Sequence, residues 1–160
     1  GVELVVCSPL RRALQTALVA CPHKPLHVLE ALRERHFGLP VDRRRTRTQI
    51  AAECTGVDGS CSDLSGLDGE ADPFPPEARE HSLAAKGRAQ RALQWLLDRP
   101  EQRIAVVSHG WLLQFGLFSP SGGANFDFDG GEELAKARKA WRNCEVRAFA
   151  VTRGAEGRVV

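Results

Sequence analysis

The chain has 160 residues, the length of one ordinary domain, with a formal net charge of +2 and an apolar content of 42%. Charged residues make up 26% of it, as in globular proteins, and the small net charge gives no support for nucleic-acid or membrane binding. No apolar run reaches the roughly 18 residues of a membrane span, and no signal peptide is visible. The five cysteines are odd in number and scattered, which argues against a zinc site or a disulfide framework and predicts reduced thiols in a cytoplasmic compartment.

The first predicted unit is a strand, a tight turn and a helix. Glu3–Cys7 is a short apolar strand, and Ser8 and Pro9 have the residue types that favour a helix N-cap and the first helical position. Arg11 and Arg12 fall at the start of this helix, where the backbone dipole disfavours a cation by about 0.3–1 kcal/mol but attracts an anion. The placement predicts either a bound anion such as phosphate or two solvated arginines.

The next segments combine a strand with a charged turn. Leu26–Leu29 is predicted to be the second strand, and the charged segment Leu32–Gly38 follows it. Within this segment, Glu34 is a candidate general acid. An ion pair with Arg33 or Arg35 is the alternative.

A basic run and a long irregular stretch occupy the middle of the chain. Arg43–Arg47 would either clamp an acidic substrate or begin a solvated helix that pairs with the acidic stretch Asp58–Glu80. Thr48–Cys54 is predicted to be a short helix. No period is visible from Thr55 to Pro76, which is typical of a functional lid or a disordered insertion.

The second half of the chain contains the clearest helix and strand. Glu77–Asp98 carries one stripe of alanine and leucine at helical spacing. Ile104–Val107 has the composition of a buried strand in a parallel sheet, and Trp111–Phe118 has helical length. His109 therefore lies at the carboxyl end of a strand, where open α/β sheets bind their ligands. The alternative is a turn histidine that only hydrogen-bonds its neighbours.

The C-terminal part is predicted to contain a loop, a helix and a last strand. The glycine-rich loop is Ser119–Gly131, the helix is Glu132–Trp141 and the strand is Glu145–Thr152.

Several kinds of chemistry are excluded by spacing. A cysteine-dependent phosphatase needs an arginine after five intervening residues, and none of the cysteines has one. Around Ser108 the nucleophile elbow Gly-x-Ser-x-Gly is missing, because Val106 replaces the first glycine. There is no P-loop and no dinucleotide fingerprint, and the histidines lack the spacing of a helical metal site.

Three segments, in this order along the chain, resemble motifs of the histidine phosphatase superfamily, whose members include phosphoglycerate mutases and many phosphatases. The first is similar to the family's Ser-x-Leu-x-Arg-Ala-x-x-Thr-Ala, the second stands where the family places an acidic residue, and the third resembles its second histidine motif. They are Ser8–Ala17, Leu32–Gly38 and Val106–Gly110, and Asn143–Val146 also resembles the start of the family's closing strand.

The resemblance implies one phosphoglycerate mutase-like domain over residues 1–160, an α/β/α sandwich of three layers around a mostly parallel sheet. By the same resemblance, Arg12 holds the phosphoryl group, His109 stabilises its developing charge and Glu34 gives a proton to the leaving oxygen. Gly110, through its backbone N–H, and Arg35 are the further residues expected at the substrate. Arginine and a protonated histidine stabilise phosphoryl oxygens without a metal, so we expect neither metal nor cofactor.

One departure from the family concerns the nucleophile. The family uses a histidine in an Arg-His-Gly motif at the end of its first strand, and this sequence has no such motif; His36 follows Arg35, but Phe37 replaces the glycine. We therefore expect the nucleophile and that strand to lie before Gly1, and the chain to be incomplete at its N-terminus and inactive alone. The predicted function is hydrolysis of a small phosphomonoester. The alternatives are a phosphoglycerate mutase-type phosphotransferase and a non-catalytic relative that binds phosphorylated ligands.

Overall fold

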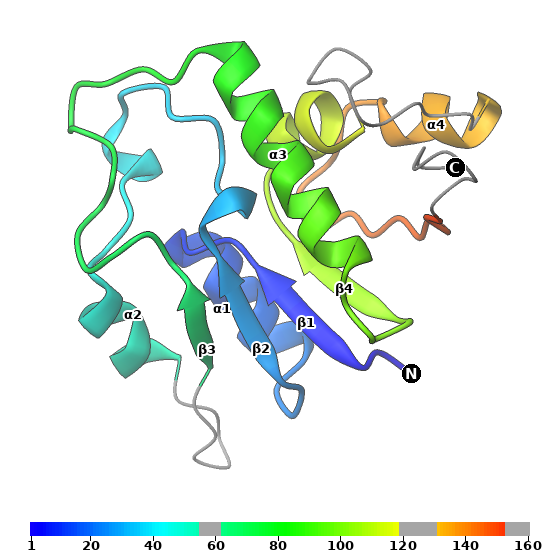
Figure 1. The fold of residues 1–160 in the computed structure, drawn as a ribbon, viewed down its shortest axis with the longest axis horizontal. Coiled ribbons are helices and arrows are strands. Elements are labelled where there is room, and N and C mark those ends of the chain that lie inside the picture. The colour runs from blue at the N-terminus through cyan, green and yellow to red at the C-terminus, as the bar shows by residue number, and fades with distance from the viewer. Residues whose placement is uncertain (55–61, 119–130, 153–160) are drawn as a thin grey trace.

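The computed structural model describes residues 1–54, 62–118 and 131–152. Within them, four parallel strands form one sheet in the order β3-β2-β1-β4 (Figure 1). The strands are β1 (Leu4–Cys7), β2 (Leu26–Leu29), β3 (Asp63–Gly66) and β4 (Ile104–Val107).

Helices connect these strands and lie on both faces of the sheet, with α1 behind it and α3 in front of it in Figure 1. The α-helices are α1 (Arg11–Ala20), α2 (Arg47–Glu53), α3 (Ser82–Leu97) and α4 (Gly131–Ala137). The other helical segments are the 3₁₀ turns η1 (Glu30–Leu32) and η2 (Pro40–Asp42) and the π-helix η3 (Leu112–Leu117). No helix among the described residues is both long enough and apolar enough to span a membrane.

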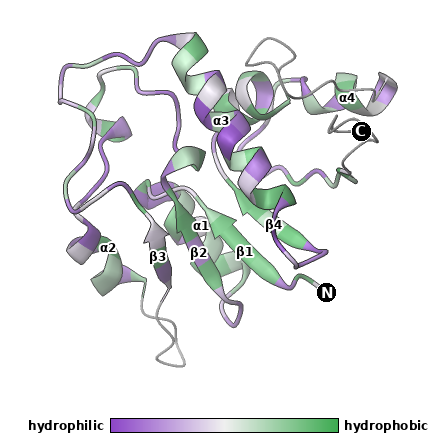
Figure 2. Ribbon diagram, viewed as in Figure 1, coloured by the Kyte–Doolittle hydropathy of each residue, from purple (hydrophilic) through white to green (hydrophobic). Residues whose placement is uncertain are grey.

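The core has two halves because side chains alternate across β1. Leu4 and Val6 belong to the cluster that includes residues of α3 and η3, whereas Val5 and Cys7 belong to the one with α1 and α2. Figure 2 shows β1 and β4 as hydrophobic strands between the two layers of helices, whereas β3 is largely hydrophilic. The predicted α/β fold with a parallel central sheet and helices on both faces is thus confirmed.

Two predicted helices begin later than expected. The predicted N-cap at Ser8 is wrong: α1 begins at Arg11, after Leu10 in an extended conformation. The Ser8 backbone N–H instead donates to Val107 and continues the strand pairing, while its Oγ accepts the N–H of Leu10. The long helix begins at Ser82 rather than Glu77, because the preceding residues form hydrogen bonds to the segment around His36.

β3 lies inside the stretch predicted to have no regular structure. Only Leu64 of its four residues is buried, so the sequence has no apolar run there. The strand pairs with β2, and the Nδ1 of His27 lies 2.8 Å from Oδ2 of Asp63. Gly66 is required by close packing, since a Cβ there would lie 2.7 Å from the Val28 carbonyl oxygen. Residues 55–61 of the predicted loop lie outside the described residues.

The predicted last strand, Glu145–Thr152, is wrong: these residues form no strand. Arg147 instead donates to three carbonyls at the end of α4, so side-chain bonds rather than a strand ladder hold the segment. α4 is also shorter than the predicted helix Glu132–Trp141. Residues 119–130 of the predicted glycine-rich loop lie outside the described residues.

β4 differs from β1 in burial, although both are apolar. All four residues of β1 are buried, whereas all four of β4 are only half-buried. β4 forms one edge of the sheet that the described residues make. The sequence therefore predicted this strand correctly but not its degree of burial.

Candidate functional site

The carboxyl ends of β1 and β4 bring together two residues that are far apart in the sequence. Because the strands are neighbours and run parallel, Ser8 and His109 leave the sheet at the same edge. The Nε2 of His109 lies 2.8 Å from the Oγ of Ser8. Both side chains are buried, so this contact fixes the imidazole at the edge where a ligand is expected.

Arg12 contacts the other ring nitrogen of His109. Its Nε donates to Nδ1 at 3.2 Å, and its Nη1 donates to the Val41 carbonyl at 2.6 Å. Its Nη2 lies 3.6 Å from Oδ1 of Asp42, a buried carboxylate. The side chain is 46% exposed, so the guanidinium is held on one side and open on another.

These contacts fit a neutral His109. An Nδ1 that accepts from Arg12 carries no proton, so Nε2 carries it and donates to Ser8. Burial, with the positive charges of Arg12, Arg88 and Arg33, lowers the pKa of His109 to about 3. The surroundings of His109 therefore favour the neutral imidazole over the charged imidazolium expected from the sequence, whereas the negative charge of a bound phosphate would favour protonation.

Glu34 lies beside this pair and holds the start of the following helix. Its carboxylate accepts the backbone N–H groups of Arg35 at 2.9 Å and of Trp111 and Leu112 at 3.2 Å each. Burial raises the pKa of Glu34, against the lowering effect of these N–H groups and of Arg12. A raised pKa favours the protonated form that a proton donor requires. Of the two predicted alternatives, the ion pair with a neighbouring arginine does not form.

Arg88 of α3 supports the backbone on which Glu34 stands. Its guanidinium donates to the carbonyls of Ala31 and Arg33 at 2.8 Å and of Glu34 at 3.3 Å. Two further bonds, at 2.9 and 2.7 Å, run to the carboxylate of Glu80. Arg88 and Glu80 are both buried, so this pair fixes the segment from within the protein.

A second buried ion network includes Arg44 of the predicted basic run, whereas Arg45 has a different partner. Arg33 is fully buried and donates to Glu30 at 3.0 Å and to Asp72 at 2.7 Å. Arg44, from the basic run, pairs with Glu30 at 2.9 Å, and its Nη groups donate to carbonyls of residues 69–71. Arg45 forms an ion pair with Glu53. The expected solvated pairing with the acidic stretch is therefore wrong for Arg44: its carboxylate partner is Glu30, it contacts the acidic stretch through backbone carbonyls, and it is buried.

The two remaining predicted residues lie at the margin of the site. Arg35 is half-buried and donates from Nε to the carbonyl of Glu80 at 3.0 Å. Gly110 is exposed, and a Cβ there would meet nothing within 4 Å, so there is open space beside its backbone. Residues 1–54, 62–118 and 131–152 contain no group of three or more His, Cys, Asp or Glu that could hold a metal ion.

The structure therefore gathers Arg12, Glu34 and His109 at one edge of the sheet, and their roles in catalysis stay predictions. Sequence reasoning missed Ser8 as the partner of His109 and Asp42 as the carboxylate beside Arg12. Ser8 was predicted as a helix cap, and Asp42 directly precedes the predicted basic run Arg43–Arg47. No signal in the sequence pointed to the Arg88–Glu80 pair.

The fold and site define an α/β protein with an arginine and a histidine at the carboxyl edge of a parallel sheet, an arrangement suited to binding a phosphoryl group. Residues 1–119 match the family model of the histidine phosphatase superfamily (branch 1), and the chain belongs to this superfamily. It is 29% identical, over 94% of its length, to a phosphoglycerate mutase-like protein of Arabidopsis thaliana. The chain spans 63% of the length of that relative. No solved structure matches the chain significantly.

Proposed function

We propose that this chain supplies the phosphate-binding and proton-donating groups of a metal-independent phosphomonoester hydrolase. The observation that carries the proposal is the 3.2 Å contact between Arg12 Nε and His109 Nδ1 at the carboxyl edge of the sheet. This contact brings a guanidinium and an imidazole together, and both are groups that bind phosphoryl oxygens. The substrate is a small phosphorylated molecule.

In the proposed reaction, a histidine that is not among these 160 residues attacks phosphorus in line with the leaving oxygen. A nitrogen–phosphorus bond forms while the bond from phosphorus to that oxygen breaks, and Glu34 gives its proton to the oxygen. Water then attacks phosphorus and gives a proton to the Glu34 carboxylate; the nitrogen–phosphorus bond breaks, and phosphate and the free histidine are released. Arg12 stabilises most of the negative charge on the phosphoryl oxygens. His109 contributes further stabilisation once the bound dianion favours protonation of its ring.

The edge strand β4 supports the proposed origin of the nucleophile. Among the described residues, β4 is paired on one side only, with β1. A further strand parallel to β4 on its other side would end beside His109. A histidine at the end of such a strand would face the same anion as Arg12.

The test compares turnover and binding in the natural full-length protein. We expect hydrolysis of a panel of phosphomonoesters, with kcat/KM lowered by orders of magnitude in Arg12→Met and His109→Gln. Near-normal turnover in either variant would contradict the roles proposed here. Val19→Ala is the control, because Val19 is 83% exposed on α1 and makes no contact named at the site.

The name of the Arabidopsis relative makes a phosphoglycerate mutase the second candidate. A mutase would interconvert 2- and 3-phosphoglycerate, which phosphorus NMR detects, without net release of phosphate. A non-catalytic phosphate-binding protein would bind inorganic phosphate with no turnover of any ester.

A further inference from the structure

Beside the proposed phosphate site lies a row of three aromatic rings and one guanidinium. The Cζ of Arg35 lies 5.0 Å from the ring centre of Phe37 and 5.2 Å from that of Trp111. The rings of Trp111 and Phe115 have centroids 5.8 Å apart at an angle of 45°. We call Phe37, Arg35, Trp111 and Phe115 the aromatic row.

The aromatic row is joined to both sides of the site by backbone hydrogen bonds. The N–H of Trp111 donates to the Glu34 carboxylate, and the N–H of Phe37 donates to Asp42 at 3.1 Å. Asp42 in turn lies beside Arg12. The row therefore begins next to the proposed proton donor, on which the leaving oxygen of a substrate would be placed.

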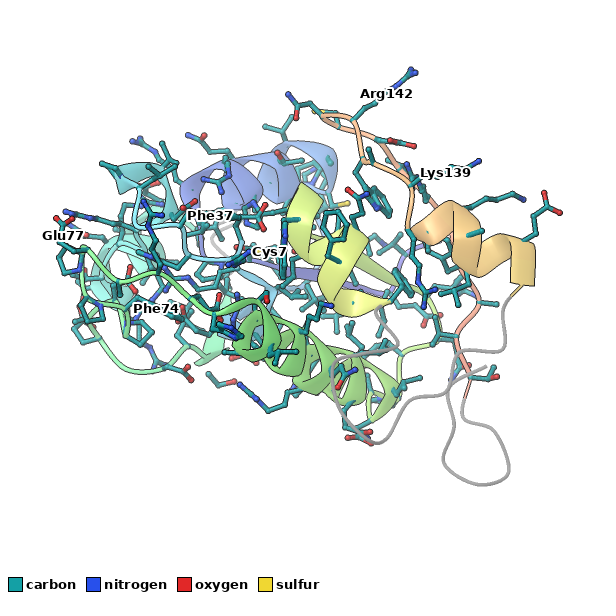
Figure 3. The ribbon with its side chains drawn as sticks, turned by 90° about the horizontal axis from the view of Figure 1, so that it is seen from above. Cys7, Phe37, Phe74, Glu77, Lys139 and Arg142 are labelled. Carbon is teal, nitrogen blue, oxygen red and sulfur yellow. The ribbon has the colours of Figure 1, made fainter. Side chains whose placement is uncertain are left out.

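The outer rings of the row are exposed despite their apolar character. Phe37 is 37% exposed and Phe115 is 45% exposed, and the neighbouring Val41 is 66% exposed. In the view of Figure 3, Phe37 is labelled on the left, and Lys139 and Arg142 are labelled on the right. Single exposed apolar side chains are ordinary, but a group of them around a polar site marks a place where a ligand binds.

The chemistry of the row favours one kind of leaving group. A planar ring can lie against the faces or edges of Trp111 and Phe115, which adds about 0.5–1.5 kcal/mol per aromatic pair beyond the burial of area. Among the described residues, the hydrogen bond of the Arg35 side chain runs from Nε to Glu80, which leaves its Nη groups for an acceptor on the ligand. A small aliphatic polyol has no ring of its own to pair with Trp111 and Phe115.

We propose that the substrates are aryl phosphates, with the aromatic ring of the leaving group held by the aromatic row. This inference rests on the proposed function, since it assumes that the phosphate lies at Arg12. The ring then occupies the space over Trp111 and Phe115, and the phenolic oxygen faces Glu34. This substrate class includes small aryl phosphate esters and the phosphotyrosine side chain.

The test uses two non-hydrolysable anions, phenylphosphonate and methylphosphonate, titrated calorimetrically into the natural full-length protein. We expect phenylphosphonate to bind at least about ten-fold more tightly, as one good aromatic contact provides. Phe115→Ala and Trp111→Leu should remove this advantage while they leave the Kd of methylphosphonate unchanged. Val19→Ala, a matched exposed apolar residue outside the row, should change neither.

Equal affinity for the two phosphonates, or an advantage of the phenyl compound that survives in both variants, would overturn the inference while leaving the proposed function in place. Failure of both phosphonates to bind would overturn the proposed function and this inference with it. Displacement of phenylphosphonate by O-phosphotyrosine alone, or also by a phosphotyrosine peptide, distinguishes the two sources of the aryl group.

Discussion

Replacing Arg88 by methionine removes a buried cation that donates hydrogen bonds to backbone carbonyls of residues 31–34, the segment that ends at Glu34. The side chain forms five hydrogen bonds, of which two run to the Glu80 carboxylate and three to carbonyls of the segment. Loss of one partner of a buried ion pair destabilises a protein by about 3–5 kcal/mol, because the other charge stays buried without compensation. This is a large part of the roughly 5–15 kcal/mol that stabilises an ordinary domain. We expect the free energy of unfolding to fall by about 3–5 kcal/mol.

Urea denaturation of the natural full-length protein measures this change, with Arg99→Met as the matched control. Arg99 pairs with Glu101 through the same two kinds of nitrogen, at 3.1 and 3.2 Å, but at the surface. Its loss should matter far less, since water solvates the carboxylate that remains. The double variant Arg88→Met with Glu80→Gln should recover part of the stability. Equal losses in Arg88→Met and Arg99→Met would refute the reasoning.

Three further predictions concern the site and the sheet. Because the pKa of His109 is about 3 in the folded chain against 6.5 ordinarily, the unfolded state binds more protons between these values. The stability due to the neutral ring is thus complete above pH 6.5 and lost progressively toward pH 3; in denaturation experiments across this range, His109→Gln should show a flatter slope than the wild type. For Glu34→Gln we expect kcat/KM to fall by about 10²–10⁴-fold on alkyl phosphates and much less on p-nitrophenyl phosphate, whose leaving group needs no proton; equal losses on both would rule out a proton donor. Gly66→Ala should lower the free energy of unfolding by about 1–3 kcal/mol, since its Cβ would lie 2.9 Å from Nε2 of His27 and closer still to the Val28 carbonyl; an unchanged urea midpoint would contradict this.

The strands were predictable where apolar residues stand together. β2 and β4 have the predicted bounds, because Leu26–Leu29 and Ile104–Val107 are compact runs that helical spacing does not explain. β3 was not predictable, because it sits at the edge of the sheet with one buried residue and depends on pairing with β2. The last strand was predicted for a segment whose start resembles the family's closing strand, and that resemblance does not reveal that Arg147 occupies nearby carbonyls.

The proximity of Arg12 and His109 follows from two sequence signals, each a strand that ends in a turn before a helix. The charge state of His109 was not predictable, because it depends on burial and on arginines that are distant in the sequence. The contacts of Glu34 were equally hidden, since an acidic residue between two arginines looks like half of an ion pair. Its carboxylate accepts the N–H of the adjacent Arg35 and N–H groups 77 and 78 residues further along the chain.

The fully buried Arg33 imposes an order of events on folding. It directly precedes Glu34, and its carboxylate partner Asp72 comes 39 residues later. A contact of such separation requires closure of a long loop before it gives any stabilisation. We therefore expect a refolding chain to form its local helices before it acquires affinity for phosphate, so that recovery of ligand binding lags behind recovery of helical structure.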